Sequence, residues 1–308
     1  SLFVIFIGAV GLFPMLQFLG TPSAIVSQSY LYISTIVNGV AVTFAYNLCA
    51  GLLRAVGDSL AALYFLIIAA ILNILLDLYF ITQLHLGVQS AGIATIIAQG
   101  ISALLCLLYI RKKVPFLLPH RKDFVWDKEL YQDLLSQGLA MGLMTSIVSI
   151  GTVILQSAIN QLGTTIISAQ VAARRIMSFA VLPITAIASS ITTFISQNFG
   201  AEQFQRIKKG VTIANLLSWV WSVLVAALLF FTSPSLTSFI SGSTNPDLIA
   251  NASLYLQISS CFYPILASLI ILRNALQGMG KKLTPLTSSF IELFGKIFFV
   301  LWIIPHTG

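Results

Sequence analysis

The residues most able to do chemistry in this chain are a carboxylate and an amide inside an apolar segment. Asp77 and Asn73 lie in the run SLAALYFLIIAAILNILLDLYFI, residues 59–81, in which Asp77 is the sole charged residue. Because they are four residues apart, a helix places both on one face. A carboxylate inside a bilayer costs about 2.5–3.5 kcal/mol on insertion scales, and such groups mostly mark ion or substrate paths. The pair predicts an ion site in a transporter; the competing interpretation is a structural carboxylate held by a neighbouring helix.

The composition of the chain indicates a lipid environment rather than water. Of its 308 residues, 57% are hydrophobic and 8% are charged, whereas an ordinary soluble domain carries about 25% charged residues. No soluble core absorbs so much apolar sequence. The chain is therefore expected to be a polytopic α-helical membrane protein.

The net charge of +7 does not indicate nucleic acid, because of where the positive charges lie. Thirteen of the 16 Lys and Arg residues fall in four short connections, at Arg54, 111–128, 206–209 and 273–282 (one, six, three and three residues). An excess of Lys and Arg in alternate connections marks the cytoplasmic side of a membrane protein. These connections are therefore predicted to be cytoplasmic.

Nine apolar segments approach or exceed the roughly 20 residues that a helix needs to cross a bilayer. They are residues 2–18, 24–52, 60–82, 88–110, 135–161, 166–198, 210–232, 247–274 and 284–304. Residues 232–247 are expected to form an outer loop. The longest polar connection, 111–134, separates a partial N-terminal lobe at 1–110 from a C-terminal lobe at 135–308, and its second half alternates like a surface helix.

The chain also repeats itself weakly at an offset of 223–225 residues. YLYIS at 30–34 returns as YLQIS at 255–259, and LRAVGDSL at 53–60 returns as LQGMGKKL at 276–283. A repeat with matching orientation implies two lobes related by an axis along the membrane normal. The counterparts of the spans at 135–161 and 166–198 would precede residue 1. We therefore expect a parent of two six-helix lobes, from which this chain lacks the first two helices, part of the third and the last.

Six segments, in order, resemble the multidrug and toxic compound extrusion (MATE) family. They are LLRAVGDSL (52–60), NILLDLYFI (73–81), LGVQSAGIATIIAQ (86–99), SAQVAARRIMSF (168–179), PITAIASSITTFISQNFGAEQFQRIKKG (183–210) and LRNALQGMGKKLTPL (272–286). The resemblance implies twelve helices in two lobes. It also implies an H⁺- or Na⁺-coupled antiporter that exports drugs or organic cations.

The same resemblance implies a cation or proton site in the first lobe. The family's Asn and Asp on the fifth helix, and its small-residue carbonyl and Thr on the sixth, match Asn73, Asp77, Ala91 and Thr95. A Tyr on the fourth helix matches Tyr32 by spacing, with Tyr46 as the alternative.

The geometry of a helical hairpin supports this set. Asp77 and Thr95 are each nine residues from Leu86, so at 1.5 Å per residue they should lie at similar depth. Oxygen ligands of these types suit a hard cation such as Na⁺. The carboxylate could instead carry a proton, because an apolar pocket favours the neutral acid.

Two departures from the family pattern confine the expected coupling site to the first lobe. The family's first-helix Asp would precede residue 1, and the span at 135–161 has no acidic residue. At the positions that the repeat assigns to the second lobe, Glu292 and Lys296 form an i,i+4 pair of opposite charge. This pair is interpreted as structural.

The sequence offers little for other classes of function. It contains no HExxH, GxSxG or P-loop lysine motif, so an enzyme is not expected. His85, His120 and His306 are scattered and predict no metal site. The expected partners are the lipid bilayer and a small-molecule substrate, without nucleic acid or cofactor, for a monomer in the cell membrane. The alternatives are a lipid-linked-saccharide flippase of the same superfamily and an inactive truncated fragment.

Overall fold

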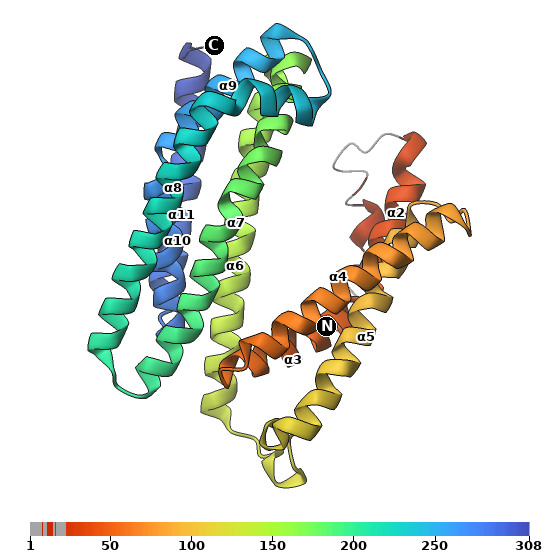
Figure 1. Cartoon of the computed structure of the whole chain (residues 1–308), viewed down its shortest axis with the longest axis vertical. Helices are drawn as coiled ribbons and strands as arrows, with labels where there is room; N and C mark the ends of the chain where they lie inside the picture. The colour runs from red at the N-terminus through yellow and green to blue at the C-terminus, as the bar shows by residue number, and fades with distance from the viewer. Residues whose placement is uncertain (1–7, 9–10, 15, 17–22, 308) are drawn as a thin grey trace. The chain divides into compact units, whose positions relative to one another are not determined.

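All regular elements among the described residues, 8, 11–14, 16 and 23–307 of the computed structural model, are helical (Figure 1). Helices satisfy their own backbone hydrogen bonds, which lipid cannot do for them. The chain divides into two compact units, residues 1–125 and 126–308. Most of the expected first span, 2–18, lies outside the described residues.

Over residues 23–125, the first unit contains four long helices and two short turns. These are α2 (Ser23–Asn38), α3 (Val40–Ala55), α4 (Ser59–Thr82), α5 (Gln89–Lys113), η1 (Pro115–Leu117) and η2 (Arg121–Asp123). Helices α4 and α5 form an antiparallel hairpin against which α2 and α3 pack (Figure 1). The hairpin thus carries both segments that the sequence assigns to the ion site.

The predicted single span at 24–52 is instead a bent pair. Helices α2 and α3 meet at 45° around Gly39. A Cβ at Gly39 would collide with the side chain of Ile96 on α5. The lack of a side chain at Gly39 therefore lets the bend lie directly against α5.

Asp58 joins the start of α4 to the end of α5. Its Oδ1 accepts a hydrogen bond from the backbone N–H of Ala61, 3.1 Å away, and so caps the helix. Its Oδ2 accepts from the hydroxyl of Tyr109 at 2.8 Å. The hairpin is thereby held together at the end opposite to its connecting turn.

The second unit contains six long helices. They are α6 (Lys128–Ile159), α7 (Thr164–Gly200), α8 (Phe204–Ser241), α9 (Pro246–Cys261), α10 (Tyr263–Gly278) and α11 (Leu283–Phe298). Short helical turns also occur, η3 (Asn160–Leu162), η4 (Phe299–Ile303) and α12 (Ile304–Thr307). Helix α7 packs against α8, α9 and α10, and α11 packs against α6 (Figure 1). The expected surface helix in the 111–134 connection is continuous with the next span, because α6 begins at Lys128.

The expected outer loop at 232–247 was wrong over most of its length. Helix α8 continues through Pro234 to Ser241 and ends at Gly242, which has a φ of 63°. A proline inside a helix removes one hydrogen bond, here the bond to the carbonyl of Phe230. Gln257 of α9 replaces it, because its Nε2 donates to the Phe230 carbonyl at 3.1 Å. A tertiary contact therefore sustains the helix past its proline.

The predicted span at 247–274 is also a bent pair. Helices α9 and α10 meet at 55° around Phe262. Pro264 lies in the first turn of α10, where its ring is tolerated but where it prevents a straight continuation of α9. Among the described residues, six single helices are long and apolar enough to span a membrane, or eight spans if each bent pair is one.

Candidate functional site

Three of the predicted site residues are joined by hydrogen bonds across the α4–α5 hairpin. The side chain of Asn73 on α4 donates from Nδ2 to Oγ1 of Thr95 on α5 at 3.2 Å. The Thr95 hydroxyl donates in turn to the carbonyl of Ala91, one turn earlier in α5, at 2.8 Å. The hairpin therefore gathers an amide, a hydroxyl and a carbonyl at one depth.

Asp77 lies one turn along α4 from Asn73 and is half-buried. Its Oδ1 is buried and accepts no hydrogen bond from the residues that the structure describes. Polar atoms buried in this way almost always have a partner. The unpaired oxygen favours a ligand at Asp77 over the competing interpretation of a purely structural carboxylate.

Tyr32 lies against α5 through its backbone near Gly92, the residue after Ala91. Its side chain is 36% exposed, and no hydrogen bond links it to another described side chain of the set. A Cβ placed on Gly92 of α5 would lie 3.5 Å from the Tyr32 carbonyl and 3.2 Å from Cγ2 of Thr35. Tyr46, the alternative, is buried in a different cluster with Leu53 and Cys106.

The sequence analysis missed two glutamines that extend the polar face of α5. Gln89 donates from Nε2 to Oγ1 of Thr35 on α2 at 3.2 Å. Gln99, one turn from Thr95, accepts from the hydroxyl of Thr43 on α3 at 2.6 Å. The signal was present, because glutamines at 89 and 99 stand out in an apolar helix. These bonds join α5 to α2 and α3.

The donor set of the hairpin suits a small hard cation or a proton. Carboxylate, amide, hydroxyl and carbonyl oxygens are the ligands that such cations prefer. The unpaired Oδ1 of Asp77 fits either a cation or a proton, since each would satisfy a buried carboxylate oxygen. Across the described ranges, no group of three or more His, Cys, Asp or Glu residues could hold a metal ion.

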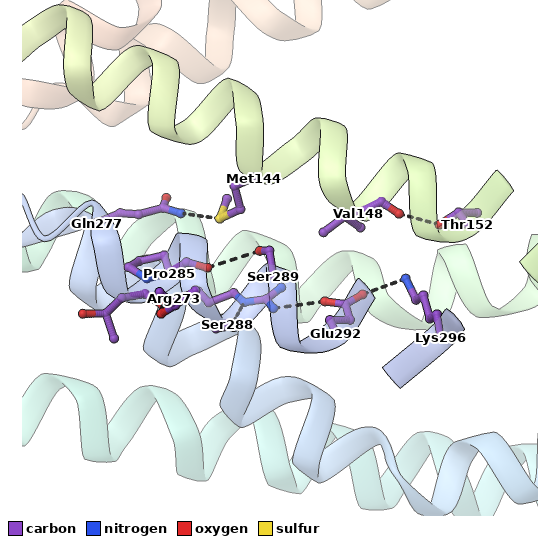
Figure 2. Close-up of polar contacts among 12 residues, drawn as sticks. Met144, Val148, Thr152, Arg273, Gln277, Pro285, Ser288, Ser289, Glu292 and Lys296 are labelled. Atoms are coloured by element: carbon purple, nitrogen blue, oxygen red, sulfur yellow. Dashed lines mark hydrogen bonds and ion pairs between the residues drawn. The ribbon is translucent and has the colours of Figure 1, made fainter. Parts of the chain in front are cut away.

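A second polar cluster lies within the other unit (Figure 2). Glu292 on α11 accepts from Lys296 at 2.8 Å and from Arg273 on α10 at 3.0 Å. Arg273 does not lie in a connection, as the sequence analysis expected, because α10 continues to Gly278; its side chain is 14% exposed. Its guanidinium group is paired with the carboxylate of Glu292 on the neighbouring helix α11.

Comparison with known proteins identifies the family of the chain. The sequence model of the MatE family matches residues 1–79 and 140–302. The probable multidrug resistance protein YpnP of Bacillus subtilis is 29% identical over 293 residues, which cover 93% of this chain and 64% of that protein. The probable multidrug resistance protein YoeA of the same organism is 24% identical, with coverage of 97% and 66%. The chain thus spans about two thirds of the length of these relatives.

Solved structures show the same fold. An outward-facing conformation of a multidrug resistance MATE family transporter of the MOP superfamily aligns with a TM-score of 0.90 at 19% sequence identity. The alignment covers 98% of this chain and 68% of that one. At this identity the likeness concerns the fold alone.

Proposed function

Because the chain belongs to the MatE family of multi-pass membrane transporters, we propose that it serves in the ion-coupled export of drugs. Its coupling site would be Asp77, with Asn73, Thr95 and Ala91 beside it. The observation that carries this assignment is the buried, unpaired Oδ1 of Asp77 next to the hydrogen-bonded Asn73–Thr95–Ala91 series. Tyr32 remains a proposed member of the site because its helix, α2, packs against α5 beside Ala91.

The proposed mechanism is a competition between states of the first lobe. A bound Na⁺ or proton neutralises Asp77. Thr95 commits its hydrogen to Ala91, so its oxygen lone pairs are oriented toward Asn73 and the site. The coupling ion binds one state of the lobe more tightly and the drug binds the other. These differences in affinity between the two states drive the transporter from one state to the other. The chain needs no resident cofactor for this cycle.

The substrate class rests on similarity. Relatives named as multidrug resistance proteins support drug export and do not favour the saccharide-flippase alternative. Organic cations are the class that the resemblance favours. We further propose a monomer whose 1–110 and 135–308 parts are lobes joined by a cytoplasmic linker at 111–134.

The direct test is efflux from proteoliposomes. Purified protein is reconstituted, loaded with a fluorescent drug and given an inward Na⁺ gradient, an inward proton gradient or neither. Faster drug efflux under one gradient is expected. Equal rates under all three conditions would refute ion coupling, and no efflux above that of protein-free liposomes would support the inactive alternative.

A further inference from the structure

The second unit contains a cavity of about 490 Å³ that the proposed coupling site does not use. The residues that line it include Leu155 and Ile159 of α6, Gln170 of α7, Tyr255 of α9, and Glu292 and Lys296 of α11. Ligand pockets for drug-sized molecules typically measure about 300–1,000 Å³ and combine apolar walls with a few polar groups. The cavity matches that description in both size and lining.

The charges at this cavity do not balance. Glu292 uses one carboxylate oxygen for Lys296 and the other for Arg273 (Figure 2). Arg273 is further engaged, because its Nε donates to Oγ of Ser288 at 2.6 Å. Two cations therefore share one carboxylate, which leaves one formal positive charge in excess. Of the two cations, only Lys296 lines the cavity.

The ammonium group of Lys296 has donors to spare. It carries three N–H groups, and its one hydrogen-bond acceptor among the described residues is Glu292. Its side chain is 24% exposed within this mostly apolar surrounding. A charge in such a medium attracts an opposite charge more strongly than it would in water. The free donors and the excess charge both favour an anion.

Helix α6 packs directly against the side chain of Lys296. Gly151 of α6 is buried, and a Cβ there would lie 2.9 Å from Cδ and 3.6 Å from Nζ of Lys296. Any larger residue at 151 would displace the lysine. Contacts with α6 and α11 thus fix the position of the ammonium group, whereas a surface lysine would rotate freely.

The cavity wall also contains a hydrogen-bond acceptor without a donor. Gln170 of α7 is 6% exposed, and its Oε1 has no partner among the described residues. Leaving such an oxygen unpaired is costly, so it favours a ligand that brings an N–H or O–H group. The cavity therefore favours a ligand that carries a hydrogen-bond donor for Gln170 as well as a negative charge for Lys296.

From these groups we infer that the cavity binds an amphiphilic anion. The ligand has an apolar or aromatic body, a carboxylate that pairs with Lys296, and an N–H or O–H group that donates to Gln170. If the proposed transport function holds, this inference identifies a class of exported substrate in addition to the organic cations expected from the resemblance.

The test compares two fluorescent probes that differ in the sign of their charge. Dansylglycine carries a carboxylate, monodansylcadaverine carries an ammonium group, and both have a sulfonamide N–H and the same aromatic body. Each is titrated into purified protein in lipid nanodiscs, without any gradient, and bound probe is read from dansyl fluorescence. Dansylglycine should bind at least about tenfold more tightly, as expected for a charge-assisted hydrogen bond.

Variants assign the preference to this cavity. Lys296→Met keeps the apolar stem, removes the excess charge and should weaken dansylglycine binding about tenfold without weakening binding of the cationic probe. Lys296→Arg should retain the preference for the anion. The matched control is Lys209→Met, which removes a lysine charge from the first turns of α8 and should change neither probe.

Equal affinities of the two probes in the unmodified protein would overturn the inference, even if Lys296→Met failed to fold. An unchanged dansylglycine affinity in a well-folded Lys296→Met protein would overturn it as well. Neither result bears on ion coupling, because the titration involves no gradient and does not depend on Asp77. Conversely, failure of gradient-driven efflux leaves the probe preference intact.

Discussion

Asn73 and Thr95, 22 residues apart in sequence, meet across the α4–α5 hairpin with 3.2 Å between Nδ2 and Oγ1. The sequence placed Asp77 and Thr95 at one depth, and the structure pairs Thr95 with Asn73 instead. Asp77 thereby keeps one buried carboxylate oxygen unpaired. Asn73 and Thr95 are thus bonded to each other while Asp77 has a free acceptor, which supports the proposed ion site.

Asp77→Asn should abolish ion coupling without unfolding the protein. The amide keeps the size of the side chain and removes its charge and its titration, and a neutral amide is also easier to bury. Efflux under an imposed Na⁺ or proton gradient should fall to the rate without a gradient, while the elution profile in detergent is unchanged. Asp247→Asn, the same substitution in the first turn of α9, serves as the control. Wild-type coupling in a well-folded Asp77→Asn protein would end the ion-site hypothesis.

Thr95→Val should reduce coupled efflux less than Asp77→Asn does. Valine keeps the shape of threonine but removes one neutral oxygen from a site with several ligands, and it leaves the Asn73 amide without its acceptor. The control is Thr152→Val on α6, where the hydroxyl donates only to the carbonyl of Val148 in its own helix at 3.0 Å. A Thr95→Val protein with the same ion dependence as the control would exclude Thr95 from the site.

Gln257→Leu should destabilise the second unit, because the Phe230 carbonyl loses its donor. The expected cost is about 1–3 kcal/mol, the penalty for a polar group left unpaired where lipid replaces water. In a Pro234→Ala background the cost should shrink, since alanine restores the backbone N–H that proline lacks. Thermal unfolding of the wild type, both single variants and the double variant gives the coupling energy. Additive effects would mean that Gln257 does not compensate for the proline.

Gly278→Ala should lower the thermal stability of the protein. A Cβ at Gly278 would lie 2.7 Å from the backbone oxygen of Thr192 and 3.2 Å from Ile195, so α7 and α10 would have to separate. Overpacking of this kind typically costs about 1–3 kcal/mol. Gly142→Ala is the control, because an added methyl group there meets nothing within 4 Å. Equal unfolding midpoints for the two variants would contradict the close contact.

Single cysteines in the basic connections should be accessible only from the cytoplasm. The positions to test are 115–125, 202–209 and 276–282, in a protein whose three native cysteines have been replaced. Membrane-permeant thiol reagents should label them in intact cells, whereas impermeant reagents should not, because the Lys and Arg bias sets the orientation. Labelling of a 115–125 cysteine by an impermeant reagent would reverse the proposed topology.

The sequence alone was sufficient for the properties that depend on local patterns. Apolar runs of about 20 residues determine membrane helices, because lipid leaves the backbone no other partner. The four-residue spacing of Asn73 and Asp77 places them on one face of α4, and recurring turns indicate the family. None of these properties requires knowledge of which helix lies next to which.

Other features were decided by contacts between helices. From the sequence, Pro234 indicates the end of a helix, but in the structure Gln257 donates to the Phe230 carbonyl and the helix continues. Likewise, the sequence indicates that Arg273 lies in a connection, but in the structure Arg273 is paired with Glu292 of α11. In both cases a local rule was overridden because a distant side chain satisfied the group that would otherwise be costly in lipid. The unpaired oxygens of Asp77 and Gln170 are likewise visible only once every neighbour has been placed. Tertiary structure decides them because hydrogen-bond satisfaction depends on three-dimensional surroundings, which periodicity and composition do not encode.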